Sequence, residues 1–142
     1  MGRSNIRPLS PFEKRWMKVF AAGIAKKDIK QYVTSTGNYI WHVFSWELLP
    51  VDSFVIGDEA RKAFDAQDKT NARYYEPWPV DGPHEPVYQS PTAAELDDLT
   101  ECYVVAADES WTYIKTHENG LCGPYFYKPS LFAKTETVAT RL

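Results

Sequence analysis

Residues 101–127 carry the pattern that most constrains the fold of this chain. Two segments rich in aromatic and β-branched residues, 101–107 and 111–116, flank the polar run Asp108-Glu109-Ser110. Apolar segments joined by such a short polar run are typical of a β-hairpin. Turn residues follow, and Tyr125-Phe126-Tyr127 then predicts a further edge strand. Because side chains alternate along a strand, three residues of the second segment and the His that follows it should share one face: Trp111, Tyr113, Lys115 and His117.

The N-terminal region predicts helices. Ser10 and Glu13 have the spacing of a capping box, with Pro11 at the first helical position. Five apolar residues then recur at helical spacing: Phe12, Trp16, Val19, Phe20 and Ile24. We expect a helix from Pro11 to about Ala25 that packs Phe12, Trp16 and Phe20 on the sheet. A second short helix, capped by Asp28, should follow.

The middle of the chain predicts alternating strands and helices. Residues 39–46 are apolar on both faces and predict a central strand, with His42 hydrogen-bonded in the core. Residues 47–57 read as a loop, and 58–67 predict a helix capped by Asp58. Residues 73–76 predict a strand that could pair in parallel with 39–46. A Ser90-Pro91 start predicts one more short helix, whose end carries Asp97 and Asp98 against the helix dipole.

These elements predict one α+β domain over residues 1–142. We expect a mixed, mostly antiparallel sheet of about five strands with three or four helices packed on it. The ends, 1–9 and 130–142, should fray. No apolar run reaches the roughly 18 residues that span a bilayer, and the N-terminus lacks the apolar region of a secretory signal. We therefore expect a cytoplasmic protein, without a membrane, whose Cys102 and Cys122 are reduced.

Charge is distributed unevenly along the chain. Residues 1–35 hold eight Lys/Arg and two Asp/Glu, whereas residues 36–142 hold eight Lys/Arg and seventeen Asp/Glu. The acidic body would repel phosphates, which argues against a nucleic-acid partner. An acidic surface instead favours capture of a basic partner, and an aromatic content of 15% is high enough to supply interface anchors.

Motifs for catalysis are missing from the sequence. It has no glycine-rich phosphate loop, nucleophile elbow or zinc-protease motif. His117, Cys102 and Cys122 are the residues with metal-ligand chemistry, and their spacing matches no familiar zinc site. We therefore expect no catalytic residue, no cofactor and no metal.

Three blocks of the chain stand out: Trp41-His-Val-Phe-Ser45, Glu59-Ala-Arg-Lys-Ala-Phe64, and Trp111-Thr-Tyr-Ile-Lys-Thr-His-Glu118 with Gly123-Pro-Tyr-Phe126. They resemble a family of small, uncharacterised bacterial proteins. The resemblance implies a bacterial, cytosolic, stand-alone domain, and it implies no established activity.

The first functional hypothesis is a bacterial immunity protein that neutralises a cognate toxin, a nuclease by preference, by covering its basic surface. Its contact residues would be acids near the hairpin and two exposed aromatics, one of them in the proline-rich segment 76–87: Asp97, Asp98, Glu101, Asp108, Glu109, Trp78 and Tyr113. The alternative is a small enzyme or ligand-binding protein with a pocket around His117, lined by Trp111, Tyr113 and Cys122. A third reading is a structural or regulatory subunit without a toxin partner.

Overall fold

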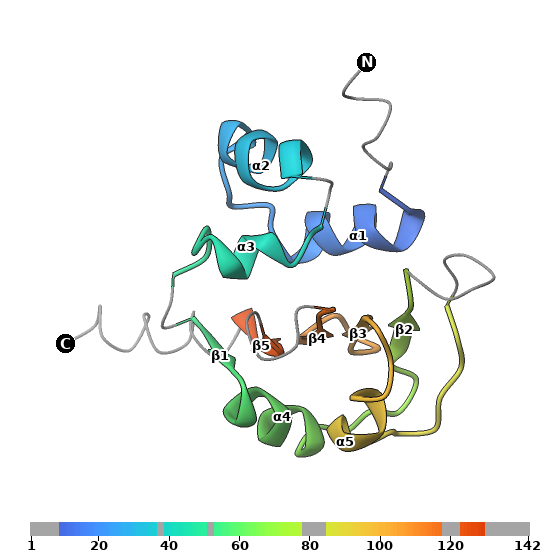
Figure 1. Ribbon diagram of the computed structural model, residues 1–142. Helices are drawn as coiled ribbons and strands as arrows, with labels where there is room; N and C mark the ends of the chain where they lie inside the picture. Colours follow the sequence, from blue (N-terminus) through green and yellow to red (C-terminus); the bar gives the residue numbers. More distant parts are fainter. Residues whose placement is uncertain (1–8, 37–38, 51–52, 78–84, 118–122, 130–142) are drawn as a thin grey trace, which may run out of the picture. The chain divides into compact units, whose positions relative to one another are not determined.

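The computed structural model describes residues 9–36, 39–50, 53–77, 85–117 and 123–129 (Figure 1). The chain divides into two compact units, residues 1–51 (the helical unit) and residues 52–142 (the sheet unit). The fold class is α+β, as predicted, with a five-stranded antiparallel sheet. Residues 1–8 and 130–142 of the ends predicted to fray, and most of the proline-rich segment, lie outside the described residues.

The helical unit contains α1 (Pro11–Phe20), α2 (Lys26–Tyr32), the short 3-10 helix η2 (Thr34–Thr36) and α3 (His42–Ser45). The predicted capping box at Ser10 is confirmed: Glu13 N donates to Ser10 Oγ at 3.2 Å, and Ser10 N donates to Glu13 Oε1 at 3.0 Å. Helix α1 ends at Phe20 rather than near Ala25. The cause is the Ala-Ala-Gly run that follows, because glycine is a poor helix former. Ala25, not Asp28, is the capping residue of α2.

Aromatic side chains form the interior of the helical unit. Trp16, 1% exposed, packs against Phe20 at 5.4 Å and against Phe44 at 5.9 Å between ring centroids. The apolar stripe predicted for the first helix is thus buried at Phe12, Trp16 and Phe20. Its predicted packing on the sheet would join the two units and stays a prediction.

The strand predicted over residues 39–46 is wrong. Residues 42–45 form helix α3, in which His42 Nδ1 lies 2.8 Å from Ser45 Oγ. The strand preference of aromatic and β-branched residues reflects how well they pack on a pleated surface rather than a backbone rule. A short apolar run is therefore compatible with either structure until its neighbours are known. His42 is hydrogen-bonded as expected, although it is only partly buried.

The sheet unit contains β1 (Phe54–Ile56), α4 (Asp58–Asp65), β2 (Arg73–Tyr75), α5 (Ala93–Leu96), β3 (Cys102–Val105), β4 (Thr112–Lys115) and β5 (Tyr125–Tyr127). The strand order is β1-β5-β4-β3-β2, with every neighbouring pair antiparallel. The predicted hairpin is confirmed, with Tyr103 opposite Ile114 and Val104 opposite Tyr113.

Three strand predictions need correction. Strand β2 pairs with β3 and not in parallel with residues 39–46, which are helical. Strand β5 lies between β1 and β4, so it is an interior strand and not an edge. The edge strand beside β5 is β1, which lies in residues 47–57, the segment predicted to be a loop. A three-residue strand leaves little alternation for the sequence to show.

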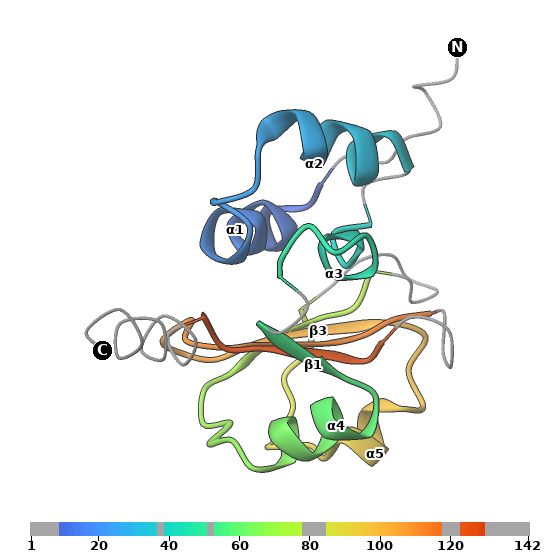
Figure 2. The ribbon, with the colours of Figure 1, turned by 90° about the vertical axis from the view of Figure 1, so that its left-hand side faces the viewer.

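Helices α4 and α5 cover the same face of the sheet (Figures 1 and 2). Phe64 of α4 stacks on Tyr113 of β4 with ring centroids 4.2 Å apart, and meets Trp111 edge-on at 5.9 Å. Leu96 of α5 joins the same buried cluster. Tyr113 of β4 and Trp111 just before the strand are therefore buried on the face that α4 and α5 cover.

The N-terminal caps of α4 and α5 differ from the predicted ones. Gly57, with φ of +64°, precedes α4, and Asp58 is its first helical residue without a capping hydrogen bond. For α5 the cap is Thr92 rather than Ser90: Thr92 Oγ1 accepts from Glu95 N at 3.2 Å, and Thr92 N donates to Glu95 Oε1 at 3.1 Å. The Thr92–Glu95 pair is the true capping box.

Candidate functional site

Glu101, predicted as a surface contact, is buried. Its side chain is 1% exposed and accepts from the Tyr103 hydroxyl at 3.0 Å. Its other oxygen lies 2.6 Å from His117 Nδ1 and accepts from His117 N at 3.2 Å. The carboxyl group thus ties the start of β3 to the end of β4. The prediction that Glu101 meets a partner is wrong, because its oxygens are engaged inside the sheet unit.

Tyr113, predicted as an exposed anchor, is fully buried beneath α4. Burial raises the pKa of its hydroxyl, with the nearby Asp97 carboxylate as the next cause. Its hydroxyl oxygen has no hydrogen-bond partner among the described residues. A residue in this position is a core residue and cannot serve as an interface anchor in this fold.

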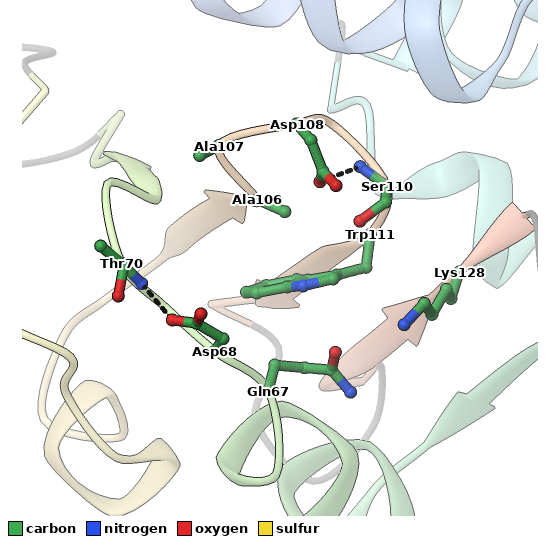
Figure 3. A pocket seen from close by; sticks show the side chains of 9 residues that line it. All are labelled: Gln67, Asp68, Thr70, Ala106, Ala107, Asp108, Ser110, Trp111 and Lys128. Carbon is green, nitrogen blue, oxygen red and sulfur yellow. Dashed lines mark hydrogen bonds between the residues drawn. The ribbon is translucent and has the colours of Figure 1, made fainter.

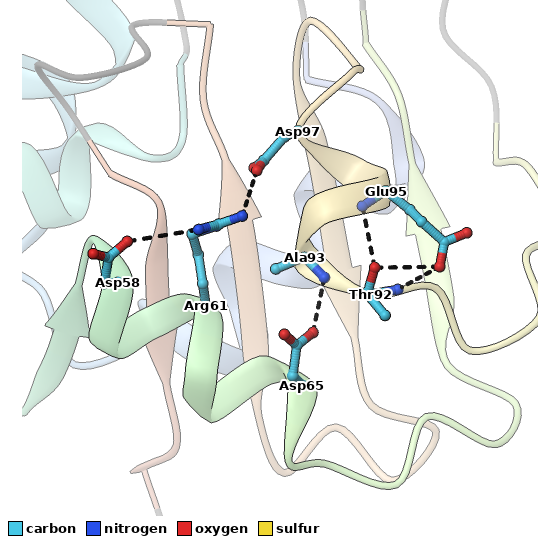
Figure 4. Close-up of polar contacts among 7 residues, drawn as sticks. All are labelled: Asp58, Arg61, Asp65, Thr92, Ala93, Glu95 and Asp97. Carbon is cyan, nitrogen blue, oxygen red and sulfur yellow. Dashed lines mark hydrogen bonds and ion pairs between the residues drawn. The ribbon is translucent and has the colours of Figure 1, made fainter.

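Asp97 lies at the C-terminal end of α5, where a carboxylate opposes the helix dipole. Arg61 of α4 supplies the compensating charge, with its Nη2 2.6 Å from Asp97 Oδ2 (Figure 4). The Asp97 carboxylate is the main cause of the raised pKa of Arg61. Asp65 Oδ1 also accepts from Ala93 N at 2.8 Å, so two polar contacts join α4 to α5. The neighbouring Asp98 is exposed.

A pocket of about 330 Å³ lies at the turn between β3 and β4 (Figure 3). Three segments that are distant in the sequence form it: the chain after α4, the β3–β4 turn and the residue after β5. Its lining residues are Gln67, Asp68, Thr70, Ala106, Ala107, Asp108, Ser110, Trp111 and Lys128. We refer to it below as the turn pocket.

Two carboxylates of the turn pocket are held by their own turns. Asp68 Oδ1 accepts from Thr70 N at 2.9 Å, and Asp108 Oδ1 accepts from Ser110 N at 3.0 Å. Hydrogen bonds from Thr70 lower the pKa of Asp68, and those from Ser110 lower the pKa of Asp108. Both side chains are exposed and carry negative charge at neutral pH. The turn pocket therefore offers two fixed anions.

Trp111 lies in the middle of the turn pocket, with the polar side chains around its indole (Figure 3). The residue is only 3% exposed, and Phe64 and Phe126 pack on it at 5.9 and 5.7 Å between centroids. The backbone of the turn is fixed as well, because Ala106 N donates to Trp111 O at 3.1 Å. No described residue accepts a hydrogen bond from the indole N–H. The indole is thus a rigid wall of the site with an unused donor.

A family model described as a domain of unknown function (DUF4275) matches residues 9–126. The chain belongs to the DUF4275 family. The resemblance to an uncharacterised family is thereby confirmed. Neither the comparison with curated proteins nor that with solved structures gave a match. The matched range of the DUF4275 domain includes Asp68, Asp108 and Trp111 of the turn pocket, while Lys128 lies beyond it.

Some of the site residues predicted from the sequence of this DUF4275 protein line the turn pocket. Asp108 and Trp111 line the turn pocket, and Tyr113 is in the core cluster with Trp111. His117 follows the opposite end of β4, beside Glu101, and is not a lining residue of the turn pocket. Cys122 and Trp78 lie outside the described residues. Glu109, in the same turn, is partly exposed with φ of +60°.

Asp68, Thr70 and Lys128 were missed. Asp68 has a local signal, since Asp followed two residues later by Thr is typical of a side-chain-capped turn. Nothing in the sequence places that turn beside residues 106–111, about 40 positions later, because the approach depends on how β2, β3 and α4 pack.

The described residues offer little for covalent or metal chemistry. Burial raises the pKa of the Cys102 thiol, which keeps it protonated at neutral pH. Within the described ranges, no group of three or more His, Cys, Asp and Glu side chains is placed to hold a metal ion. In the same ranges, none of the helices has the length and apolar character to cross a bilayer.

Proposed function

We propose that this protein is a bacterial, cytoplasmic binding protein of the immunity type. It neutralises a cognate toxin, a nuclease by preference, by covering the basic surface with which the toxin holds its substrate. The observation that carries the proposal is the charge of the sheet unit, where sixteen Asp/Glu stand against eight Lys/Arg, a formal charge of −8. Such a field speeds the approach of a basic protein.

The polar contacts within the sheet unit sharpen this argument. Several acids are already engaged: Asp97 with Arg61 at 2.6 Å, Glu85 with Arg73 at 2.7 Å, and Glu101 with His117 at 2.6 Å. Asp68 and Asp108 instead accept hydrogen bonds within their own turns. Their negative charge therefore points to the turn pocket as the centre of the contact surface.

The test uses the toxin encoded beside this gene. Titration of the toxin with wild-type protein should abolish its activity at a molar ratio of about one, because an inhibitor that covers an active surface acts stoichiometrically. Binding kinetics by surface plasmon resonance should show an association rate that falls steeply with salt. Absence of binding to that toxin would refute the immunity function.

A charge reversal locates the surface. Asp108→Lys with Glu109→Lys should slow association about tenfold and weaken its salt dependence, since rim charges act mainly on the association rate. The matched control is Asp58→Lys with Glu59→Lys, which changes the charge of exposed positions on α4 by the same amount. Equal slowing in both variants would mean that net charge alone acts and that the hairpin is not at the interface.

The second candidate is a small-ligand-binding protein or small enzyme. The turn pocket favours it, since about 330 Å³ lies at the lower end of the range of small-molecule sites. The pocket lies at Trp111 rather than around His117. Quenching of tryptophan fluorescence by a small metabolite at micromolar concentration, together with no response to the neighbouring toxin, would favour this candidate over the first.

A further inference from the structure

We propose that the turn pocket is a receptor for one arginine side chain of the protein partner. This inference rests on the proposed function, because it names what the partner inserts. It goes further than charge attraction, since it assigns a role to each polar group of the pocket.

The two carboxylates select a cation. Asp68 comes from the chain after α4 and Asp108 from the β3–β4 turn, and both line the same pocket. Their hydrogen bonds to Thr70 N and Ser110 N hold the carboxylates in place. A guanidinium group carries five N–H donors in a planar fork, so it can serve two carboxylates that approach from different sides. An ammonium group has a single charged nitrogen and is less suited to both.

The Trp111 indole gives the pocket a fixed aromatic wall. Trp111 is 3% exposed and packs against Phe64 and Phe126, so it lines the pocket as a fixed wall and leaves no open ring face for stacking. Two fixed anions beside a fixed aromatic ring form a site suited to arginine.

Two donors remain for the partner's backbone. No described residue accepts from the Trp111 indole N–H, and no described residue forms an ion pair with Lys128. The Lys128 ammonium is also close enough to contribute to the lowered pKa of Asp108. Both donors fit a peptide carbonyl next to the inserted arginine. Lys128 also repels a second positive charge, so the site should prefer an isolated arginine to a polybasic run.

The experiment measures peptide binding by two-dimensional amide NMR of the full chain. The probe is a blocked Gly-Ser peptide with a single arginine, compared with peptides that carry lysine or citrulline at the same position. Citrulline has nearly the shape of arginine without its charge. The arginine peptide should shift the Trp111 indole signal, assigned with Trp111→Phe, and the amide signals of Thr70 and Ser110. Lysine should bind several-fold more weakly and citrulline at least tenfold more weakly.

Exposed carboxylates allow variants that keep the fold. Asp68→Asn with Asp108→Asn should weaken arginine binding at least tenfold, whereas the control Asp58→Asn with Glu59→Gln, of equal charge change, should leave it within twofold. Lys128→Gln should tighten binding of a two-arginine peptide. Equal binding of arginine and citrulline peptides, or equal losses in the two double variants, would overturn the assignment.

The outcomes separate this inference from the proposed function. Arginine-selective binding without any binding to the neighbouring toxin supports the receptor and refutes the immunity function. Toxin capture that is unchanged by Asp68→Asn with Asp108→Asn refutes the receptor and leaves the immunity function standing.

Discussion

The buried aromatic residues of the helical unit and of the sheet unit lie among different polar groups. In the helical unit, Trp16 contacts Phe20 and Phe44, and the buried Glu13 side chain serves the helix start. In the sheet unit, buried tyrosines come with a buried carboxyl group, as in the Tyr103–Glu101 hydrogen bond. The charges differ too: residues 1–51 hold eight Lys/Arg and three Asp/Glu, against a formal charge of −8 in the sheet unit.

This difference indicates where each unit is sensitive. The helical unit depends on apolar contacts and on a local cap, so volume changes should dominate its response. The sheet unit also depends on whether its buried hydroxyl and carboxyl groups find partners, because an unsatisfied buried polar group costs about 1–3 kcal/mol. Substitutions that change one atom should therefore discriminate between the units better than large truncations.

The largest losses of stability should come from truncating a buried aromatic side chain, and they should be of equal size in both units. Trp16→Ala and Phe64→Ala should each lower the free energy of unfolding by about 3–5 kcal/mol, because both side chains are at most 1% exposed. Urea denaturation followed by circular dichroism measures the loss. The control Val87→Ala, at a position 94% exposed, should change almost nothing. An unchanged midpoint for Trp16→Ala would show that the helical stripe is not core.

Two tyrosines of the sheet unit should respond with opposite sign to loss of a hydroxyl. Tyr103→Phe removes the hydrogen bond to Glu101 and should cost about 1–3 kcal/mol, since it leaves a buried carboxyl oxygen without that donor. Tyr113→Phe removes a buried hydroxyl without a partner among the described residues and should be neutral or stabilising by up to about 1 kcal/mol. Chemical denaturation compares the pair directly. Destabilisation of similar size in both would contradict the comparison.

The helix caps provide a matched test across the units. Ser10→Ala in α1 and Thr92→Ala in α5 each remove a capping box and should cost about 1 kcal/mol. Asp58→Ala should cost only a few tenths of a kcal/mol, because Asp58 makes no capping bond in α4 and its contact with Arg61 is exposed. A loss for Asp58→Ala as large as that for Ser10→Ala would restore Asp58 as the cap predicted from the sequence.

A smaller effect is expected at the Arg61–Asp97 pair. Their side chains are 34% and 39% exposed, so solvent screens the interaction. A double-mutant cycle with Arg61→Gln and Asp97→Asn should give a coupling of about 0.5–1 kcal/mol that decreases in high salt. Asp98→Asn is the control, and its effect on the free energy of unfolding should be smaller than that coupling. A coupling that is independent of salt would point to packing of the Arg61 stem rather than charge.

The smallest effect on stability should be the pH dependence of the turn pocket. The pKa values of Asp68 and Asp108 are lowered in the folded chain from an ordinary value of 3.8. Their contribution to stability is therefore present above the ordinary value and is lost as pH falls through the lowered one. Carboxyl NMR titration should show both groups still charged near pH 4. Ser110→Ala should raise the pKa of Asp108 and leave that of Asp68 in place; no movement at Asp108 would contradict the assigned cause.

Local interactions allowed several features to be predicted from the sequence. The capping box of Ser10 and Glu13, the apolar stripe of Phe12, Trp16 and Phe20, and the hairpin of β3 and β4 all arise between residues close in the chain. The sequence also showed Asp97 placed against the helix dipole, but its pairing with Arg61 is visible only in the structure.

Features that depend on distant neighbours could not be predicted. Residues 39–46 have strand propensity and yet contain helix α3, because an apolar segment follows its packing environment when that conflicts with its propensity. The interior position of β5, the buried face of Tyr113 and the meeting of Asp68 with Asp108 likewise required the packed sheet.

The sequence by itself determined the start of α1 at its capping box, the hairpin, and the opposite charges of residues 1–35 and 36–142. The tertiary structure decided which carboxylates pair with other side chains inside the sheet unit and which line the turn pocket. The physical reason is range: caps and turns gain their energy within a few residues, whereas strand order and the turn pocket depend on contacts whose energy appears only once distant segments have packed.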